Sequence, residues 1–253
     1  MNERLAVVIP VFNEPEITRT LAALHRQHES GALTVYVVDN GSTDDTLHRV
    51  ERFAADHPNL AIRVLHEQQK GTGAASDTGF RAAIAAGHQL VARTDGDSEP
   101  APDWSSRIRS VFASDDGVHL VGGRSVPLRD RYYRRRDDLL MPGALVLLRI
   151  MMTVKHIDPT YMRFVAGHNM AVRASAYLAV GGIGRTAIDQ RDEDIDFSVA
   201  ISHYFGAGAV RLDPRIRVAT SMRRVRRYGV GLMGIHHLLP VVRGRLIRSV
   251  DVR

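Results

Sequence analysis

Two aspartates separated by one glycine, Asp95 and Asp97, are the residues of this sequence best placed to do chemistry. They follow the apolar residues 90–92, which predict a buried strand that delivers both carboxylates into a turn ended by Pro100 and Pro102. Carboxylates at this spacing suit Mg²⁺ or Mn²⁺, because these cations take oxygen ligands and keep open positions for substrate phosphates. An ordinary acidic turn is the alternative, since Asp and Gly are both common turn residues.

A second acidic cluster lies at residues 192–196, with the sequence DEDID. It precedes Phe197, Val199 and Ile201, so the acids are expected in the first turn of a helix, where the helix dipole favours negative charge. The dipole accounts for some of the four acids but not for all of them. The others are candidates for catalysis.

A basic segment near the C-terminus has four arginines within residues 223–227. Such a segment is a solvated face, a disordered tail or an anion clamp. A clamp would suit pyrophosphate, because the planar guanidinium group binds phosphate oxygens through two parallel hydrogen bonds.

The first hundred residues alternate between strand and helix patterns. Short apolar runs at 5–11, 34–38, 62–65 and 90–94 predict strands. Helices are expected between them, the second capped by Ser42 or Thr43 and the third ended by Gly87. This alternation predicts a parallel sheet with helices on both faces.

Polar residues follow three of these predicted strands. Right-handed crossovers bring the carboxyl ends of such strands to one edge, where ligands of open α/β sheets bind. A binding cleft is therefore expected where the following residues gather: Asn13, Glu14, Asp39, Asn40, Asp95 and Asp97.

The later part of the chain is less regular. We expect a helix around Val111 and Phe112 and then a strand over 119–121, closed by Gly122-Gly123. Further on, we expect a strand with a glycine break over 164–173 and a short helix over 175–180. A hairpin-like connection is expected over 211–217, around Asp213-Pro214. The basic and aromatic residues 129–136 lead into the apolar residues 139–154. This pair predicts either an amphipathic helix at a membrane surface or a packed helix with a solvated arginine face. Pro142 and Arg149 interrupt the apolar stretch, so no transmembrane span is expected.

Composition limits the class of protein. With 253 residues, 44% hydrophobic and 25% charged, the chain fits one globular domain with an appended segment. The absence of cysteine excludes disulfides, thiolate zinc sites and cysteine nucleophiles. The net charge of +6 implies attraction to anions. The first apolar stretch is too short for a signal peptide, so we expect a cytoplasmic location, at the inner face of the membrane if the basic run contacts lipid.

Five segments taken in order resemble the family 2 glycosyltransferases. They are VVIPVFNE at 7–14, VVDNGSTDDT at 37–46, DGD at 95–97, GHNMAVRASAYLAVGGI at 167–183 and DEDIDFS at 192–198. The resemblance extends over residues 5–229. It implies a GT-A-type, Rossmann-like, mostly parallel central sheet in a single domain over residues 1–220. That domain would have a nucleotide-sugar-binding half (1–124) and an acceptor-binding half (125–220), and the basic segment 221–253 would follow.

The resemblance also implies an activity, which is inverting transfer of a sugar from a nucleotide-diphosphate sugar to an acceptor hydroxyl, with Mn²⁺ or Mg²⁺. The acceptor would be a small molecule, a glycan or a lipid-linked molecule. Asp97 would bind the metal, and Asp194 would be the general base, with Glu193 beside it. Asp39 would accept a hydrogen bond from the nucleobase of the donor, and Asp95 would face the ribose or the sugar of the donor. The residues implied at the donor are Pro10, Phe12, Glu14, Asp39, Lys70, Asp95, Gly96, Arg223 and Arg227, and those at the acceptor are Gly167, His168 and Asn169.

Two segments depart from the family pattern. Ser76-Asp77 stands where an Arg-Asn pair is usual, and Arg227-Tyr228-Gly229 replaces an aromatic signature with Trp that processive members have. The second departure favours a single transfer over polymer synthesis.

Two other classes of protein have some of the same sequence features. A sugar-phosphate nucleotidylyltransferase would have a glycine-rich basic loop after the first strand, where this chain has VFNEPE. A non-enzymatic basic protein that binds anions or nucleic acid would explain the charge but not the acids at the strand ends. No nucleic-acid partner is therefore expected.

Overall fold

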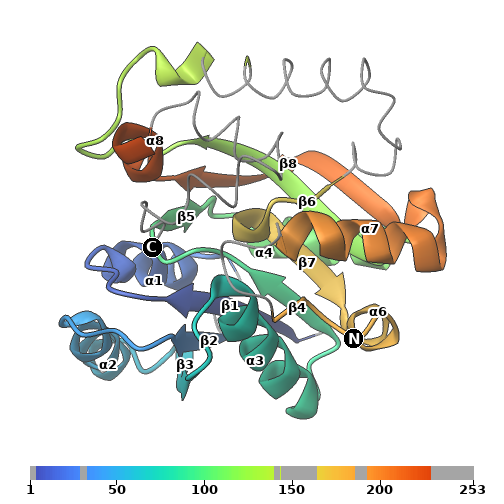
Figure 1. Cartoon of the computed structure of the whole chain (residues 1–253), viewed down its shortest axis with the longest axis horizontal. Coiled ribbons are helices and arrows are strands. Elements are labelled where there is room, and N and C mark those ends of the chain that lie inside the picture. The colour runs from blue at the N-terminus through green and yellow to red at the C-terminus, as the bar shows by residue number, and fades with distance from the viewer. Residues whose placement is uncertain (1–3, 29–32, 140–142, 144–163, 186–192, 229–253) are drawn as a thin grey trace, which may run out of the picture.

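The computed structural model describes residues 4–28, 33–139, 143, 164–185 and 193–228, which build an eight-stranded sheet with helices on both faces (Figure 1). The strand order is β3-β2-β1-β4-β7-β6-β8-β5. The strands are β1 (Leu5–Val11), β2 (Leu33–Asp39), β3 (Ala61–His66), β4 (Leu90–Arg93), β5 (Ser98–Pro100), β6 (Leu120–Pro127), β7 (Met170–Arg173) and β8 (Val210–Thr220). The helices are α1 (Ile17–His25), α2 (Thr46–Asp56), α3 (Thr72–Ala85), α4 (Trp104–Ser114), α6 (Ala174–Ala179), α7 (Glu193–Phe205) and α8 (Arg223–Tyr228), with 3-10 turns η3 (Gly167–Asn169) and η4 (Ala207–Ala209).

Side chains of β1 alternate between two hydrophobic cores. Val7 and Ile9 belong to a core that also contains residues of α1, α2 and α4. Ala6 and Val8 belong to a second core, shared with residues of α3, α6 and α7. A strand with both faces buried needs apolar residues at every position, which is why residues 5–9 form a continuous apolar run.

The four predicted strands of the first half are confirmed as a parallel set. β1 pairs with β2 and β4, and β2 pairs with β3, all in parallel. The second half is mixed, because β7 is antiparallel to β4 and β6, β5 is antiparallel to β8, and β6 and β8 are parallel. The expected α/β fold, with a mostly parallel sheet and helices on both faces, is therefore confirmed.

Two expectations for the second half are wrong. Gly122-Gly123 does not close a strand, since β6 runs on to Pro127, and residues 211–217 form no hairpin but belong to the single strand β8. The register between β6 and β8 shifts between Gly123 and Arg124. A Cβ on Gly123 would lie 1.9 Å from the Ile216 carbonyl oxygen, so the glycine permits a close strand approach at a bulge. Gly123 and Asp213-Pro214, which resemble turn signals in the sequence, thus lie where the pairing of β6 with β8 is irregular.

Two local expectations also differ from the structure. The strand expected over 164–173 is limited to β7, because η3 precedes it. Helix α2 begins at Thr46 with Asp45 at its N-cap and has no side-chain cap. Ser42 and Thr43 instead bind Asn13, whose backbone N–H donates to the Ser42 hydroxyl and whose side-chain oxygen accepts from the Thr43 N–H.

The remaining expectations fall mostly outside the described residues. Residues 140–142 and 144–154 of the apolar stretch lie there, as does the basic segment beyond residue 228. Within the described part of the chain, no helix has the length and apolar character needed to cross a membrane.

Candidate active site

Three carboxylates meet where β1 and β4 end. Asp95 and Asp97 follow β4, while Glu14 follows β1 and is 8% exposed at its side chain. The Gly96 carbonyl between the aspartates accepts a hydrogen bond from the Thr20 hydroxyl of α1 at 2.8 Å. This bond fixes the turn that presents the two aspartates.

The pKa values of these two aspartates are shifted in opposite directions. Burial would raise the pKa of Asp95, but the positive charge of Arg93, joined by that of Arg224, holds it below its usual value. For Asp97, burial together with the negative charge of Asp95 raises the pKa to about 6. The positive charges of Arg224 and Arg223 offset this rise only in part.

The second acidic cluster lies against the first through a buried arginine. Arg93, the last residue of β4, is 5% exposed at its side chain and contacts Asp95 at 3.2 Å and Glu193 of α7 at 3.5 Å. Burial raises the pKa of Glu193, and the charge of Arg93 offsets this only in part. The two acidic clusters therefore meet at this arginine.

Asp194 is held by backbone groups. Its two carboxylate oxygens accept hydrogen bonds from the N–H groups of Gly167 and Ile195, both at 2.9 Å. Each carboxylate oxygen has a second lone pair, which leaves capacity for an acceptor proton. Asp194 is thereby fixed to η3 on one side and to its own helix on the other.

Of the three η3 residues predicted at the acceptor, two lie at the acids. Gly167 binds Asp194, and His168 lies within reach of the charges of Asp95 and Asp194, with its Nε2 atom 2.5 Å from the Ser125 hydroxyl. Burial lowers the pKa of His168 and keeps the ring neutral near pH 7. Asn169 is 1% exposed and is occupied inside the core, where it accepts a hydrogen bond from the Trp104 indole at 2.9 Å and donates to the Ile216 carbonyl. That position does not suit direct contact with an acceptor.

The predicted nucleotide-side residues lie along the neighbouring strand ends. Asp39 ends β2 and accepts hydrogen bonds from the N–H groups of Gly41 and Ser42, which fold the loop after the strand. Pro10 and Phe12 are partly exposed at the end of β1. Lys70 is exposed in the loop before α3. Asn40 holds this loop in place, because its side-chain amide donates to two carbonyls of the loop and its side-chain oxygen accepts from the Gly71 N–H.

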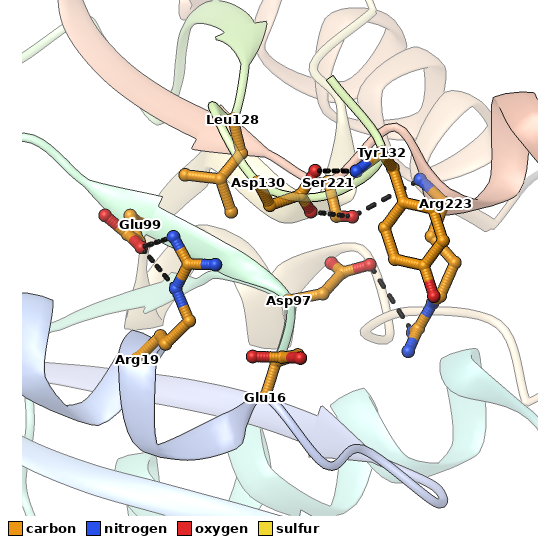
Figure 2. Close-up of a pocket in the computed structure, with 9 residues that line it drawn as sticks. All are labelled: Glu16, Arg19, Asp97, Glu99, Leu128, Asp130, Tyr132, Ser221 and Arg223. Carbon is orange, nitrogen blue, oxygen red and sulfur yellow. Dashed lines mark hydrogen bonds and ion pairs between the residues drawn. The ribbon is translucent and has the colours of Figure 1, made fainter.

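A small cavity opens beside Asp97. Figure 2 shows Asp97 between the Arg19–Glu99 ion pair and Arg223, which reaches it at 3.6 Å. The lining residues come from α1, β5, the segment after β6 and the start of α8: Glu16, Arg19, Asp97, Glu99, Leu128, Asp130, Tyr132, Ser221 and Arg223.

The donor set around Asp97 fits a hard divalent cation. Among the residues that the structure describes, no group of three or more His, Asp and Glu side chains converges on a metal position. Asp97 nevertheless presents a buried carboxylate beside Asp95 and Glu14, whose negative charges raise its pKa and would attract a cation. Mg²⁺ and Mn²⁺ sites of this kind use one or two carboxylates and take further oxygens from substrate phosphates.

Helix α8 presents its arginines in different directions. Arg223 bridges Glu14, at 2.5 Å, and Asp97. Arg224 is exposed, yet its charge lowers the pKa of Asp95 and counters the rise at Asp97. Arg226 binds the buried Asp137 and the Tyr132 carbonyl, and so anchors the helix. Arg227 is exposed.

Sequence reasoning missed one cation of the site, Arg93, and treated Arg224 only as one of four arginines in residues 223–227. Arg93 had a usable signal, because an arginine inside an apolar strand must have a charged partner. Nothing in the sequence distinguishes Arg224 from the three other arginines of its segment.

The Ser76-Asp77 departure has a structural explanation. Asp77 is 1% exposed and pairs with Arg81 and Arg185, while the Tyr177 hydroxyl donates to it at 2.7 Å. Burial raises the pKa of this tyrosine. These partners all belong to the protein itself, so Asp77 links α3 to Tyr177 of α6 and to Arg185 and is not available for a ligand contact.

Comparisons with known proteins agree with this architecture. The sequence pattern of glycosyl transferase family 2 matches residues 6–181. The glycosyltransferase AglE of Haloferax volcanii is 38% identical over 121 residues, which are 47% of this chain and 38% of the relative. Polyprenol monophosphomannose synthase of Mycolicibacterium smegmatis is 33% identical over 128 residues, 49% of this chain and 46% of the relative. The chain thus spans less than half the length of both relatives.

Solved structures share the fold at low sequence identity. The mannosyltransferase PcManGT from Pyrobaculum calidifontis, in complex with GDP-Man and Mn²⁺, has a TM-score of 0.63 at 21% identity, covering 98% of this chain and 65% of its own. Glucosyl-3-phosphoglycerate synthase from Mycobacterium tuberculosis, in complex with Mn²⁺ and UDP, has a TM-score of 0.60 at 16% identity, covering 90% and 78%. The family pattern spans more than half of the chain, and the fold agrees with it. This chain therefore belongs to glycosyl transferase family 2.

Proposed function

We propose that this chain transfers a sugar from a nucleotide-diphosphate sugar to a lipid-linked acceptor by a single inverting displacement. The observation that carries the proposal is the meeting of two acidic pairs, Asp95 with Asp97 and Glu193 with Asp194, around one buried arginine. The first pair follows a strand end where α/β sheets bind ligands, and the second begins a helix on the acceptor half.

Inverting transfer requires an activated acceptor oxygen on one face of the anomeric carbon and positive charge near the diphosphate that leaves from the opposite face. An acceptor oxygen forms a bond to the anomeric carbon while the bond to the diphosphate breaks, and that electron pair leaves with the diphosphate. Arg223 and Arg224 are placed to receive the negative charge that develops there. A divalent ion bound to Asp97 would supply further positive charge to the leaving group.

On the acceptor side, Asp194 takes the proton when the attacking group is a hydroxyl. Glu193 and His168 lie beside it and orient the acceptor. A phosphate acceptor arrives already ionised and needs positioning rather than proton removal. The name of the Mycolicibacterium smegmatis relative, polyprenol monophosphomannose synthase, favours an acceptor of this second kind.

The lipid-linked acceptor is also favoured by a basic surface beside the site. Segment 129–139 carries five exposed arginines and Leu139, which is 78% exposed. Arg226 and Ser221 bind Asp137 and Asp130 of this segment and so fix it against the start of α8 (Figure 1). We infer that the surface makes a peripheral contact with an anionic bilayer, a cytoplasmic inner face being the expected location. The residues that form it are Arg129, Arg131, Arg134, Arg135, Arg136 and Arg227.

Ligand binding and transfer test the proposal in sequence. A thermal-shift series with GDP, UDP and other nucleoside diphosphates, each with Mn²⁺ or with EDTA, should find one nucleotide that stabilises the fold only with metal. The matching sugar nucleotide should then label a short-chain polyprenyl phosphate. A protein stabilised by no nucleoside diphosphate would contradict donor binding. Transfer to a polyprenol but not to its phosphate would assign a hydroxyl acceptor.

A further inference from the structure

Arg93 occupies an unusual place at the junction of the two halves of the sheet. It ends β4, the last strand of the parallel set, and it pairs in register with Met170, the first residue of the antiparallel strand β7. Its side chain is 5% exposed, so the guanidinium is buried where it contacts the acids. Burying a charged group this deeply is costly unless that group is paired.

Three segments converge on this guanidinium. One Nη atom faces Asp95 at 3.2 Å and the other faces Glu193 at 3.5 Å, so a single planar group spans both acidic pairs. Gly167 packs directly against it, since a Cβ there would lie 2.8 Å from the arginine Cζ atom. The same glycine donates its N–H to Asp194.

We propose that Arg93 is a positioning residue for transfer, which sets the distance and direction of Glu193 and Asp194 relative to the donor side at Asp95. This inference rests on the proposed function. Arg93 acts through the carboxylates and through Gly167 rather than on the substrate. Removing it should release Asp95 and misplace the acceptor pair, but leave the nucleotide and metal side of the donor site formed, because Glu14, Asp39 and Asp97 have supports of their own.

Replacing Arg93 by lysine tests whether a positive charge at this position is sufficient or whether the planar guanidinium group is needed. Arg93→Lys keeps the positive charge, but a single ammonium cannot hold two carboxylates as a planar fork does. We expect kcat to fall by about 10- to 100-fold, since a shift near 1 Å in a reacting group costs about that much. The donor KM should stay within about threefold of the wild-type value, as expected for lost transition-state alignment rather than lost binding.

Arg173 provides the matched control. It is a largely buried arginine at the other end of β7, with its side chain 17% exposed and bonded to the carbonyls of Val118 and Phe112. Arg173→Met should lower thermal stability about as much as Arg93→Met does while leaving kcat unchanged. Equal kcat losses in the two methionine variants would show that Arg93 only stabilises the fold.

Coupling to Glu193 gives a second test. If Arg93 acts through Glu193, the kcat losses of Arg93→Met and Glu193→Gln should be strongly non-additive in the double variant. Additive losses, a wild-type kcat in Arg93→Lys, or a raised donor KM with an unchanged kcat would each overturn the inference.

Hydrogen exchange separates this inference from the proposed function. Arg93→Met should speed exchange at the Gly167 and Ile195 amides, which bind Asp194, and leave the amides of β1 and β2 unchanged. If the wild-type protein transfers no sugar, the proposed function fails, and the exchange at these two amides still decides whether Arg93 positions the acidic pair. Unchanged exchange at both amides would refute positioning.

Discussion

The raised pKa of Asp97 predicts that the metal-free protein carries a destabilising charge. Asp97 is 9% exposed at its side chain, and burial together with Asp95 raises its pKa from 3.8 to about 6. Between these two values the folded state binds more protons than the unfolded state, so the free energy of unfolding falls as the pH rises. As the pH falls to about 4 the folded state is fully protonated and the unfolded state nearly half protonated, so most of the penalty is gone.

The magnitude follows from the size of the shift. A change of about two units, at 1.36 kcal/mol for each unit, corresponds to at most about 3 kcal/mol above pH 6. Asp97→Asn removes the charge and should therefore stabilise the metal-free protein above pH 6. Because about 1 kcal/mol shifts the melting temperature of a domain of this size by roughly 2–4 °C, the expected gain is up to about 6–12 °C. The lost contact with Arg223, at 3.6 Å, reduces the gain.

The assay is thermal unfolding in EDTA at pH 4 and pH 7.5. The melting temperature of Asp97→Asn should be higher than that of the wild type at pH 7.5 and close to that of the wild type at pH 4. Asp116→Asn is the control, since this carboxylate is fully exposed, and it should change little at either pH. With Mn²⁺ and the matching nucleoside diphosphate the order should reverse at pH 7.5, because only the wild type gains binding energy through the metal.

Two results would refute this reasoning. Equal melting temperatures of wild type and Asp97→Asn at pH 7.5 in EDTA would show that Asp97 carries no buried-charge penalty. Undiminished Mn²⁺-dependent nucleotide binding in the variant would show that Asp97 is not the metal ligand. For the wild type, metal-dependent binding should weaken as the pH falls through about 6, where the carboxylate gains a proton.

Three further predictions concern the proposed roles. Asp194→Asn should lower transfer to a hydroxyl acceptor by roughly 10²–10⁴-fold while nucleotide binding persists, and a near wild-type rate would place the base elsewhere. Asp39→Ala should weaken nucleoside affinity by about 5- to 10-fold even without metal, as expected for one hydrogen bond; unchanged affinity in calorimetry would leave Asp39 a turn residue. Bound nucleoside diphosphate with metal should protect residues 221–227 from proteolysis, and equal cleavage would rule out a closing segment.

The first half of the fold could be predicted from the sequence because its signals are local. Strands such as β1 and β2 are buried on both faces and read as short apolar runs, each followed by a polar residue and a helix pattern. The second half could not be predicted in the same way. Gly123 and Asp213-Pro214 look like turn signals, and only the approach of β8 to β6 makes them parts of a bulged strand pair.

The candidate site divides in a similar way. Asp95, Asp97 and Glu14 are predictable because polar side chains at the ends of parallel strands meet at one edge. The family motif predicts Asn169 at the acceptor, yet its hydrogen-bond partners, Trp104 and Ile216, lie far away in the sequence. Long-range hydrogen bonds of this kind have no sequence signal.

The antiparallel pairing of β7 with β4 explains how distant motifs form one site. In a parallel pair, the residues before β7 would lie at the opposite end of the sheet from Asp95. Because β7 runs antiparallel, Met170 pairs with Arg93, and the η3 turn before it arrives at the carboxyl end of β4. Gly167 can therefore reach both Arg93 and Asp194, and α7 begins with its acids beside the carboxyl end of β4. The reversal of one short strand thus joins the two acidic pairs, and Arg93 lies at that reversal.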